Sequence, residues 1–144
     1  MIKFHSHFGI YGLIKNTESL LLIRKARGLY KGMYDLPGGS PQPNETNQET
    51  FIREVAEETG LKIQTFKKLT DDVITIYYNY FDNSQESILK HSSLIYFSDD
   101  YSGQLKIGSD GEDSDGAQWL KISEIEKIPC TPFVKKVKNY LKTI

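Results

Sequence analysis

The sequence predicts one α/β or α+β domain over residues 1–144, in which a long antiparallel β component is combined with two helices. Residues 2–14 alternate between two faces, which is the periodicity of a strand. Residues 72–81 and 88–98 are rich in β-branched and aromatic side chains and are joined by a short polar segment, as in an antiparallel pair. Residues 46–60 carry an apolar side, an acidic side and the start and stop signals of a helix. A chain of this length can bury one sizeable core, and nothing in the sequence suggests a second domain.

The composition argues against several classes of function. The formal net charge is −1 and the pI is about 6.3, which gives no electrostatic footprint for long nucleic acid. The longest aliphatic run, residues 20–23, is too short to cross a bilayer, and the N-terminal residues contain no apolar secretory core. We therefore expect a cytoplasmic protein with no membrane partner. Cys130 is the single cysteine, so no intrachain disulfide can form, and a packed small side chain is a better interpretation than a nucleophile.

The first strand is predicted to be followed by a turn at residues 15–18 and by a returning strand at residues 19–24, so that the two strands form a hairpin. His5 and His7 project to the same side of the first strand and could in principle bind a metal or a ligand. No third ligand lies nearby in the sequence. Histidines of the surface or of a pocket wall are therefore the preferred interpretation.

The stretch from residue 39 to residue 61 begins as a loop and continues as a helix. Two prolines and the glycines before them keep its first part out of a helix. Thr46 and Glu49 have the spacing of a capping box, in which each residue bonds the backbone amide of the other, and Gly60 provides the stop signal. The sequence thus predicts a helix that starts close to Thr46 and ends at Gly60.

One face of this helix is strongly acidic. Glu54, Glu57 and Glu58 stand at positions i, i+3 and i+4, and at about 100° per residue they share one face. The other side, which we expect to face the core, carries Ile52, Val55, Ala56 and Thr59. Five glutamates and one arginine between residues 45 and 58 give a local charge of −4, and like charges at helical spacing repel by about 0.2–0.5 kcal/mol per pair. This repulsion requires compensation.

A hard divalent cation is one source of compensation, because Mg²⁺ binds carboxylates together with waters and phosphate oxygens. The alternative is a solvated acidic helix, which is the usual interpretation of a glutamate-rich helix. Residues 39–61 fit the pattern G-x5-E-x7-R-E-U-x-E-E-x-G-U at every position, where U is an aliphatic residue. The stretch therefore resembles the Nudix box of the Nudix hydrolases, and this resemblance favours the cation over the solvated helix.

The resemblance implies the Nudix fold, an α/β/α sandwich with a mixed sheet between helices. It also implies that Glu54, Glu57 and Glu58, together with the carbonyl group of Gly39, coordinate Mg²⁺. Mn²⁺ can replace Mg²⁺, since the two ions share oxygen ligands.

Two further catalytic roles follow from the same resemblance. Arg53 would form an ion pair that orients a glutamate, either Glu45 or a member of the Glu54 to Glu58 cluster. The base that accepts the proton of the attacking water would be one of the helix carboxylates or an acidic residue of the polar segment 99–116. In that segment we name Glu112 first and Asp113 second, against the alternative of a solvated loop.

The residues expected to contact the substrate lie outside the box. Residues 24–32 hold four positive charges and two glycines, and form either a solvated loop or a basic rim that meets phosphates. In resembling proteins basic side chains of this region approach the substrate, which points to Arg24 first and then to Arg27. Tyr34 stands where the family often has a bulky aromatic, and we expect it to pack rather than react. Tyr78 belongs to a tyrosine-rich strand that either packs in the sheet or offers a platform for a nucleobase.

The remaining elements are shorter. Residues 62–69 are compatible with a further strand before the one at residues 72–81. Residues 123–126 suggest a short helical turn, and Pro132 opens a last helix whose apolar residues repeat at helical spacing up to Leu141.

The predicted function is hydrolysis of a pyrophosphate bond in a nucleoside diphosphate linked to a moiety X. The first expectation for the substrate is a nucleoside triphosphate or a modified one, with dinucleoside polyphosphates, ADP-ribose or nucleotide sugars as the alternative. A non-catalytic nucleotide-sensing module of the same fold is the alternative of another class. The partner is accordingly a small nucleotide, and the resemblance also allows a homodimer.

Overall fold

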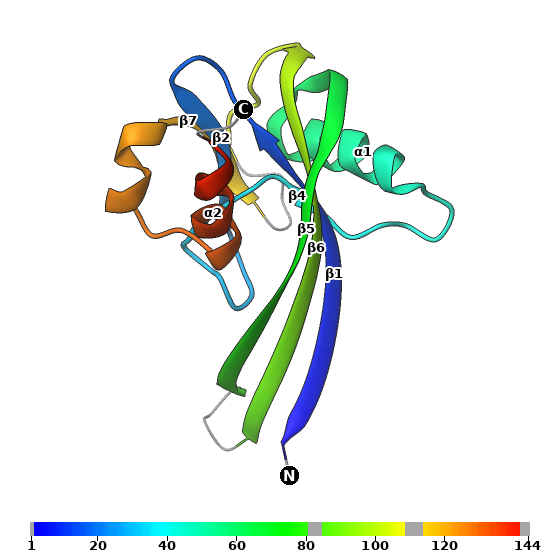
Figure 1. The fold of residues 1–144 in the computed structure, drawn as a ribbon, viewed down its shortest axis with the longest axis vertical. Coiled ribbons are helices and arrows are strands. Elements are labelled where there is room, and N and C mark those ends of the chain that lie inside the picture. Colours follow the sequence, from blue (N-terminus) through cyan, green and yellow to red (C-terminus); the bar gives the residue numbers. More distant parts are fainter. Residues whose placement is uncertain (1, 81–84, 109–113, 142–144) are drawn as a thin grey trace.

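The structure is a computed structural model that describes residues 2–80, 85–108 and 114–141. Its strands form two sheets, and α1 (Asn47–Thr59) and α2 (Pro132–Val137) lie on opposite sides of them (Figure 1). The four-stranded sheet has the order β4 (Gly38–Gly39), β1 (Lys3–Ile14), β6 (Gln85–Ser102) and β5 (Lys62–Tyr80). The three-stranded sheet has the order β3 (Tyr34–Asp35), β2 (Ser19–Lys25) and β7 (Ser114–Lys121). The predicted sandwich of helices around a mixed sheet is confirmed.

Strand β1 builds the core on both of its faces. Ile10 and Ile14 are buried on the side of α1, whereas Tyr11 and Leu13 are buried in a second cluster together with α2. The alternation seen in the sequence therefore separates two apolar layers. β1 runs parallel to β6, and β6 runs antiparallel to β5, so the sheet is mixed.

The predicted hairpin between β1 and β2 is not formed. Among the described residues, an isolated antiparallel bridge joins Lys15, directly after β1, to Leu20 of β2, and the ladders of β2 are formed with β3 and β7 instead. The edge of β1 that a hairpin partner would occupy is taken, because Ile10 and Tyr11 pair with β4 and the amide of Gly12 donates to the carbonyl of Pro37 at 2.9 Å. The glycine turn thus displaces β2 into the second sheet.

The sequence also divided one strand into two. Residues 62–69 and 72–81 were expected as separate strands, but β5 is continuous from Lys62 to Tyr80. Its register against β6 shifts between Ile63 and Thr70, and these irregularities replace the expected break. Beyond them β1, β6 and β5 extend together from the body of the molecule (Figure 1).

Both ends of α1 agree with the sequence. The amide of Thr46 donates to Glu49 Oε1 at 3.0 Å and the amide of Glu49 donates to Thr46 Oγ1 at 3.1 Å, so the capping box is present. Gly60 ends the helix in the left-handed conformation, with φ 82°, and its amide donates to Ala56 O at 2.9 Å.

The buried face of α1 is rotated from the one we predicted. Ile52 and Ala56 are exposed, whereas Phe51, Val55 and Thr59 are buried. The reason is the size of Phe51, whose ring packs against Phe66 and Tyr96 with centroids 5.1 Å away in each case. Burying this ring turns the helix so that Glu58 also enters the interior.

The C-terminal part follows the sequence with one change. Residues 122–127 form the expected short turn as the 3-10 helix η1 (Ile122–Lys127). The last helix opens at Pro132, but after Val137 it tightens into the 3-10 helix η2 (Lys138–Tyr140). Cys130 is buried, as predicted for a packed side chain.

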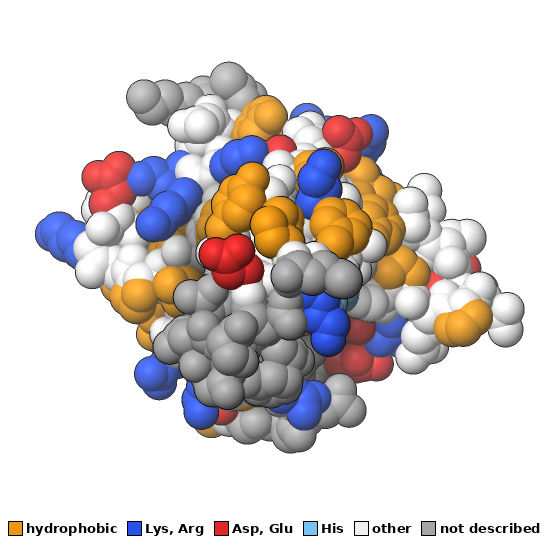
Figure 2. All heavy atoms as spheres, turned by 90° about the horizontal axis from the view of Figure 1, so that it is seen from below, with side chains coloured by type: hydrophobic (Ala, Val, Ile, Leu, Met, Phe, Trp, Pro, Cys, Tyr) orange, Lys and Arg blue, Asp and Glu red, His pale blue; other side chains and the backbone are white. Residues whose placement is uncertain are grey.

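Two observations concern the surface. Within the described ranges no helix is long and apolar enough to span a bilayer. Seen from below, hydrophobic side chains gather beside lysines and arginines (Figure 2). Among the described residues, exposed apolar side chains at the outer ends of β1 and β5 include Phe4, Phe8, Val73 and Tyr77, and Ile2 lies exposed just before β1.

Candidate active site

The site is built where the glycine turn of β4 meets α1. The amide of Gly38 donates to Glu58 Oε1 at 2.7 Å. A Cβ atom on Gly39 would lie 2.5 Å from Glu54 Cδ, so the carboxylate of Glu54 rests directly against this glycine. On the other side of the turn, a Cβ on Gly38 would lie 2.1 Å from the carbonyl oxygen of Ile10. Only glycines permit this close approach of strand, turn and helix.

Arg53 connects the carboxylates that surround the turn. Its guanidinium donates from Nη2 to Glu45 Oε1 at 2.8 Å, from Nη1 to Glu54 Oε1 at 2.9 Å and from Nη1 to Glu57 Oε2 at 3.2 Å. It also reaches the carbonyl oxygen of Ser40 at 3.3 Å. The sequence left Glu45 and the helix cluster as alternative partners, and Arg53 binds both. It thereby neutralises part of the repulsion within the acidic face.

Glu45 is the best-fixed member of this network. Its Oε1 accepts from the amide of Gln42 at 2.8 Å and from Thr50 Oγ1 at 3.0 Å, in addition to the bond from Arg53. These donors, Arg53 above all, lower the pKa of Glu45 to about 2. Glu45 therefore stays ionised and acts as the anchor from which Arg53 reaches the two glutamates of α1.

The three glutamates of α1 differ in their access to solvent. Glu58 is 4% exposed, whereas the side chain of Glu57 is 53% exposed and that of Glu54 is 17% exposed. Their oxygens, with the backbone of the turn, form a donor set that suits a hard divalent cation. In the described structure they point toward Arg53 and the turn, and no three acidic, histidine or cysteine side chains within it already converge on one point. A bound cation would have to bring oxygens of these glutamates to one common point.

A cavity of about 400 Å³ lies on the other side of the turn. Tyr11 lies between the glycine turn and the cavity. Its Cα atom packs against Gly38, where a Cβ would come within 2.7 Å of it, and its side chain lines the cavity. The remaining lining residues are His7, Lys25, Arg27, Gly28, Leu29, Tyr30, Asp35, Leu89 and His91. The cavity thus combines aromatic rings, two cations and one carboxyl group within reach of the glycine turn.

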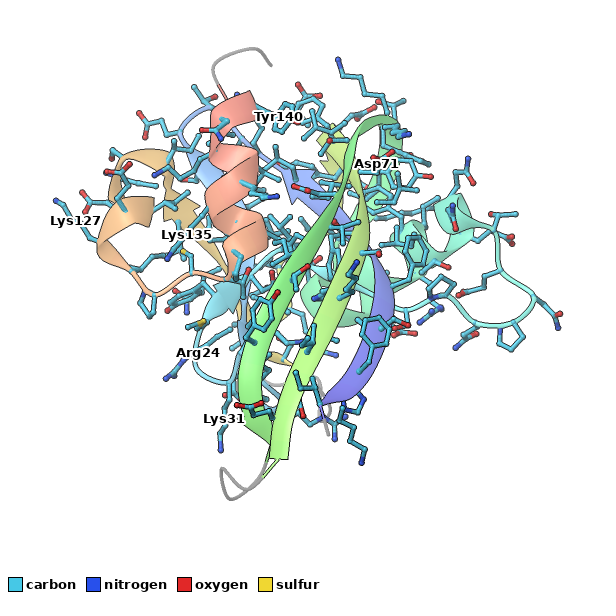
Figure 3. The ribbon with its side chains drawn as sticks, turned by 60° about the horizontal axis from the view of Figure 1, so that its bottom comes forward. Arg24, Lys31, Asp71, Lys127, Lys135 and Tyr140 are labelled. Atoms are coloured by element: carbon cyan, nitrogen blue, oxygen red, sulfur yellow. The ribbon has the colours of Figure 1, made fainter. Side chains whose placement is uncertain are left out.

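The structure places the predicted substrate residues unequally. Arg27 lines the cavity, but Arg24 is exposed and points outward on the side of the molecule that α1 does not occupy (Figure 3). Lys25, its neighbour, lines the cavity instead. Tyr34 is half-buried and packs against the apolar cluster of α2. The backbone of Tyr78 belongs to β5, opposite Ser87 of β6.

Three expectations fall outside what can be described. The side chain of Tyr78, and Glu112 and Asp113 entirely, lie outside the described residues. The proposed base of the polar segment is therefore not placed relative to α1.

Sequence reasoning missed the cavity residues of β6. His91 lies directly opposite His7 because β1 and β6 pair in parallel, and their ring centroids are 4.9 Å apart. Tyr11 Oη and His91 Nε2 form a hydrogen bond of 2.8 Å, and the ring of Tyr30 stacks on His91 at 6.1 Å. His5 and His7 were the only hint of this site in the sequence. The parallel register of β1 and β6, which brings His91 beside His7, cannot be predicted from a local pattern.

The surroundings of His91 favour its neutral form. Burial lowers its pKa to about 4, and the nearby charges of His7 and Lys25 act in the same direction. The side chain is 5% exposed, and its Nδ1 has no hydrogen-bond partner within the described part of the chain. His91 therefore acts as a neutral polar group of the cavity wall at physiological pH.

This shift predicts a loss of stability in mild acid. Between the ordinary pKa of 6.5 and the folded value of about 4, the unfolded chain binds a proton that the folded His91 does not bind. The stability that neutral His91 contributes is complete above pH 6.5 and is lost as the pH falls toward 4. We expect the free energy of unfolding to fall by about 2 kcal/mol between pH 7 and pH 5 from this residue. Urea denaturation at the two pH values measures it.

The matched control is His91→Gln, which keeps a polar side chain but cannot titrate. Asp35, whose pKa burial raises, contributes with the opposite sign and is present in both proteins, so the difference between their pH slopes isolates His91. Equal slopes in the two proteins would contradict the assignment.

Comparison with known proteins agrees with this geometry. The model of the NUDIX domain matches residues 3–142, and the chain belongs to the Nudix family. It is a Nudix pyrophosphohydrolase by class, and such hydrolases generally use divalent metal ions. The chain is 28% identical over 138 residues to an ADP-ribose pyrophosphatase of Methanocaldococcus jannaschii, which covers 96% of this chain and 75% of that protein.

Two other proteins are similar over most of this chain. An NAD-capped RNA hydrolase NudC of Pseudomonas fluorescens is 25% identical over 129 residues, but this chain spans only 40% of its length. The crystal structure of a MutT NUDIX hydrolase from Burkholderia pseudomallei has a TM-score of 0.72 at 18% identity, covering 95% of this chain and 98% of the other. That likeness concerns the fold alone.

Proposed function

We propose that this protein hydrolyses the pyrophosphate bond of a nucleoside diphosphate linked to a moiety X, with Mg²⁺ as its metal, and releases a nucleoside monophosphate and X-phosphate. The observation that carries the proposal is the network in which Arg53 holds Glu45, Glu54 and Glu57 beside the glycine turn. The negative charges of glutamates at this spacing repel one another unless positive groups bind between them. Here they have one fixed cation, Arg53, and surround a turn that a metal can approach.

In the proposed reaction Glu54, Glu57, Glu58 and the carbonyl group of Gly39 would hold the metal. When bound, a divalent cation neutralises the pyrophosphate oxygens and lowers the pKa of the attacking water. The side chains have separate tasks. Arg53 and Glu45 keep the carboxylates in position, and one carboxylate of the site accepts the water's proton, for which Glu57 has the greatest exposure of the three on α1.

The cavity would hold the part of the substrate that is not cleaved. Tyr11 and Tyr30 offer aromatic surface, and His91 offers a ring nitrogen that has no hydrogen-bond partner among the described residues. Lys25 and Arg27 bring positive charge toward the phosphates. We place ADP-ribose or a similar nucleotide sugar first, because the relative from M. jannaschii that carries this activity is similar along 96% of the chain. A modified nucleoside triphosphate is the second candidate, favoured by the two cations, since a triphosphate carries more charge.

The test is product analysis by chromatography after incubation with ADP-ribose, nucleotide sugars, nucleoside triphosphates, oxidised nucleotides and dinucleoside polyphosphates. Each reaction is run with Mg²⁺, with Mn²⁺ and with EDTA. We expect one class to be cleaved at the pyrophosphate only when metal is present. If the folded protein binds Mg²⁺ and cleaves none of them, the sensing-module alternative takes precedence. The cytoplasmic location and the homodimer remain predictions of the sequence.

A single added methyl group tests the contact between the turn and α1. Gly39→Ala places a Cβ against the Glu54 carboxylate, and the flexible side chain can move aside, so the fold should survive while the carboxylate is displaced. We expect kcat to fall by about 10- to 100-fold with a nearly unchanged melting temperature. Ser40→Ala, at the exposed neighbouring position, is the control and should keep wild-type kcat. Wild-type kcat in Gly39→Ala would show that the position of Glu54 does not matter.

A further inference from the structure

Asp35 is a buried carboxyl group to which the proposed chemistry assigns no task. It is 2% exposed, ends β3, and lines the cavity only three residues before Gly38. Burial raises the pKa of this carboxyl group. A buried carboxyl group is costly unless its hydrogen bonds are made, so its partners indicate what it does.

The bonds of Asp35 join two distant parts of the chain through one oxygen. Oδ1 accepts from Thr131 Oγ1 at 2.7 Å and from the amide of Leu36 at 2.8 Å. Thr131 is fully buried at the start of α2, and its hydroxyl group makes no capping bond to that helix. The hydroxyl group is thus committed to Asp35 rather than to its own helix.

The backbone on both sides of this contact is paired as well. The amide of Tyr34 donates to the carbonyl of Pro129 at 2.8 Å, and the amide of Thr131 donates to the carbonyl of Tyr34 at 2.9 Å. Residues 129–131 therefore run along β3, and the side-chain bond between Thr131 and Asp35 closes this contact at the end of β3 next to the glycine turn.

From Asp35 the contacts continue without interruption into the active site. The amide of Leu36 is held by Asp35, and the carbonyl of Pro37 accepts from Gly12 at 2.9 Å. The next amide, that of Gly38, donates to Glu58, and Gly39 then meets Glu54. Each residue from 35 to 39 is consequently fixed by a neighbour, and the series starts at Thr131.

We propose that Asp35, held by Thr131, is a positioning residue that sets the glycine turn against Glu54 and Glu58, and so couples the segment before α2 to the catalytic carboxylates. The proposal rests on the proposed function, because it names what keeps that site in register. Asp35 acts through the Leu36 to Gly39 backbone and does not touch the reacting atoms.

The test compares two substitutions of Thr131. Thr131→Val keeps the shape of the side chain and removes the hydroxyl group, whereas Thr131→Ser keeps the hydroxyl group and removes the methyl group. We expect Thr131→Val to lower kcat by about 10- to 100-fold at unchanged KM, as misplacement of catalytic groups does. Thr131→Ser, which retains the donor hydroxyl group, should stay close to wild type.

A second readout does not depend on turnover. In ¹⁵N–¹H spectra of the labelled protein, the amide signals of Gly38 and Gly39 should shift in Thr131→Val and remain near their wild-type positions in Thr131→Ser. Melting temperatures of all variants show whether each is folded at the temperature of the assay. If the wild-type protein cleaves no substrate, the proposed function fails, but the glycine signals still test the positioning.

Three outcomes would overturn the inference. Thr131→Val with a lower melting temperature, wild-type kcat and unshifted glycine signals would reduce the contact to a structural one. A changed KM or substrate preference in Asp35→Asn, without any effect of Thr131→Val, would make Asp35 a substrate contact instead. Equal loss of kcat in Thr131→Val and Thr131→Ser would show that packing, not the hydrogen bond, is responsible.

Discussion

Replacing Glu57 with glutamine is expected to lower kcat by at least about 100-fold, since exchanges of residues that only support a metal ligand already cost 10- to 100-fold. The substitution removes one negative charge from the proposed metal site and keeps the size of the side chain. The side chain of Glu57 is more than half exposed and, within the described part of the chain, bonds to Arg53 alone, so the fold should not change. The measurement is kcat at saturating substrate over a range of Mg²⁺ concentrations, together with the melting temperature.

The control for this variant is Glu18→Gln. Glu18 lies in the exposed turn before β2, and its substitution changes the net charge by the same amount far from α1. It should keep wild-type kcat. If Glu57→Gln retained full Mg²⁺-dependent activity, Glu57 would not be a ligand, and Glu54 and Glu58 would remain as the carboxylate ligands to test.

The local parts of this fold could be predicted from sequence because their causes are local. The capping box of Thr46 and Glu49 and the glycine end of α1 depend on residues within one turn of each other. The acidic face depends only on helical spacing. The buried face was predicted less well, because Phe51 selects its orientation by packing against rings of β5 and β6.

The parts that failed depend on which strands become neighbours. β2 was expected beside β1, but the turn at Pro37 to Gly39 occupies that edge, and a local pattern contains no information on such competition. The same limit hid the cavity. His7 and His91 meet through a parallel register over a separation of more than eighty residues, and Asp35 and Thr131 meet across 96.

The box motif predicted the members of the site but not its connections. Arg53 was expected to pair with Glu45 or with the helix cluster, and a single guanidinium serves both because its donors point in different directions. The residues that contact the substrate could not be chosen in this way, because no motif names them. Arg24 and Lys25 are successive residues at the end of β2 and point in opposite directions, so that Lys25 lines the cavity and Arg24 does not. Arg27 reaches the cavity from the segment that follows β2.

Arg53→Lys is the second variant for which we expect a large loss. A lysine has one ammonium group and cannot reach Glu45, Glu54 and Glu57 in the directions that the guanidinium serves. The carboxylates would keep their charges but lose their common fixed partner. We expect kcat to fall by about 10- to 100-fold, the usual cost of removing a group that orients metal ligands. Mg²⁺ binding measured by calorimetry should persist, because no carboxylate is removed.

The partner variant Glu45→Gln separates orientation from charge. If Arg53 acts through its anchor, Glu45→Gln should reproduce part of the loss, and the double variant should lose less than the sum of the two single losses in free energy.

The pH dependence offers an independent check. Arg53 lowers the pKa of Glu45 from 4.5 to about 2, so the stability from this pair is complete above the first value and is lost as the pH falls toward the second. Glu45→Gln should lack this part of the acid slope in urea denaturation. Additive losses of kcat, with an unchanged acid slope, would mean that Glu45 and Arg53 work independently.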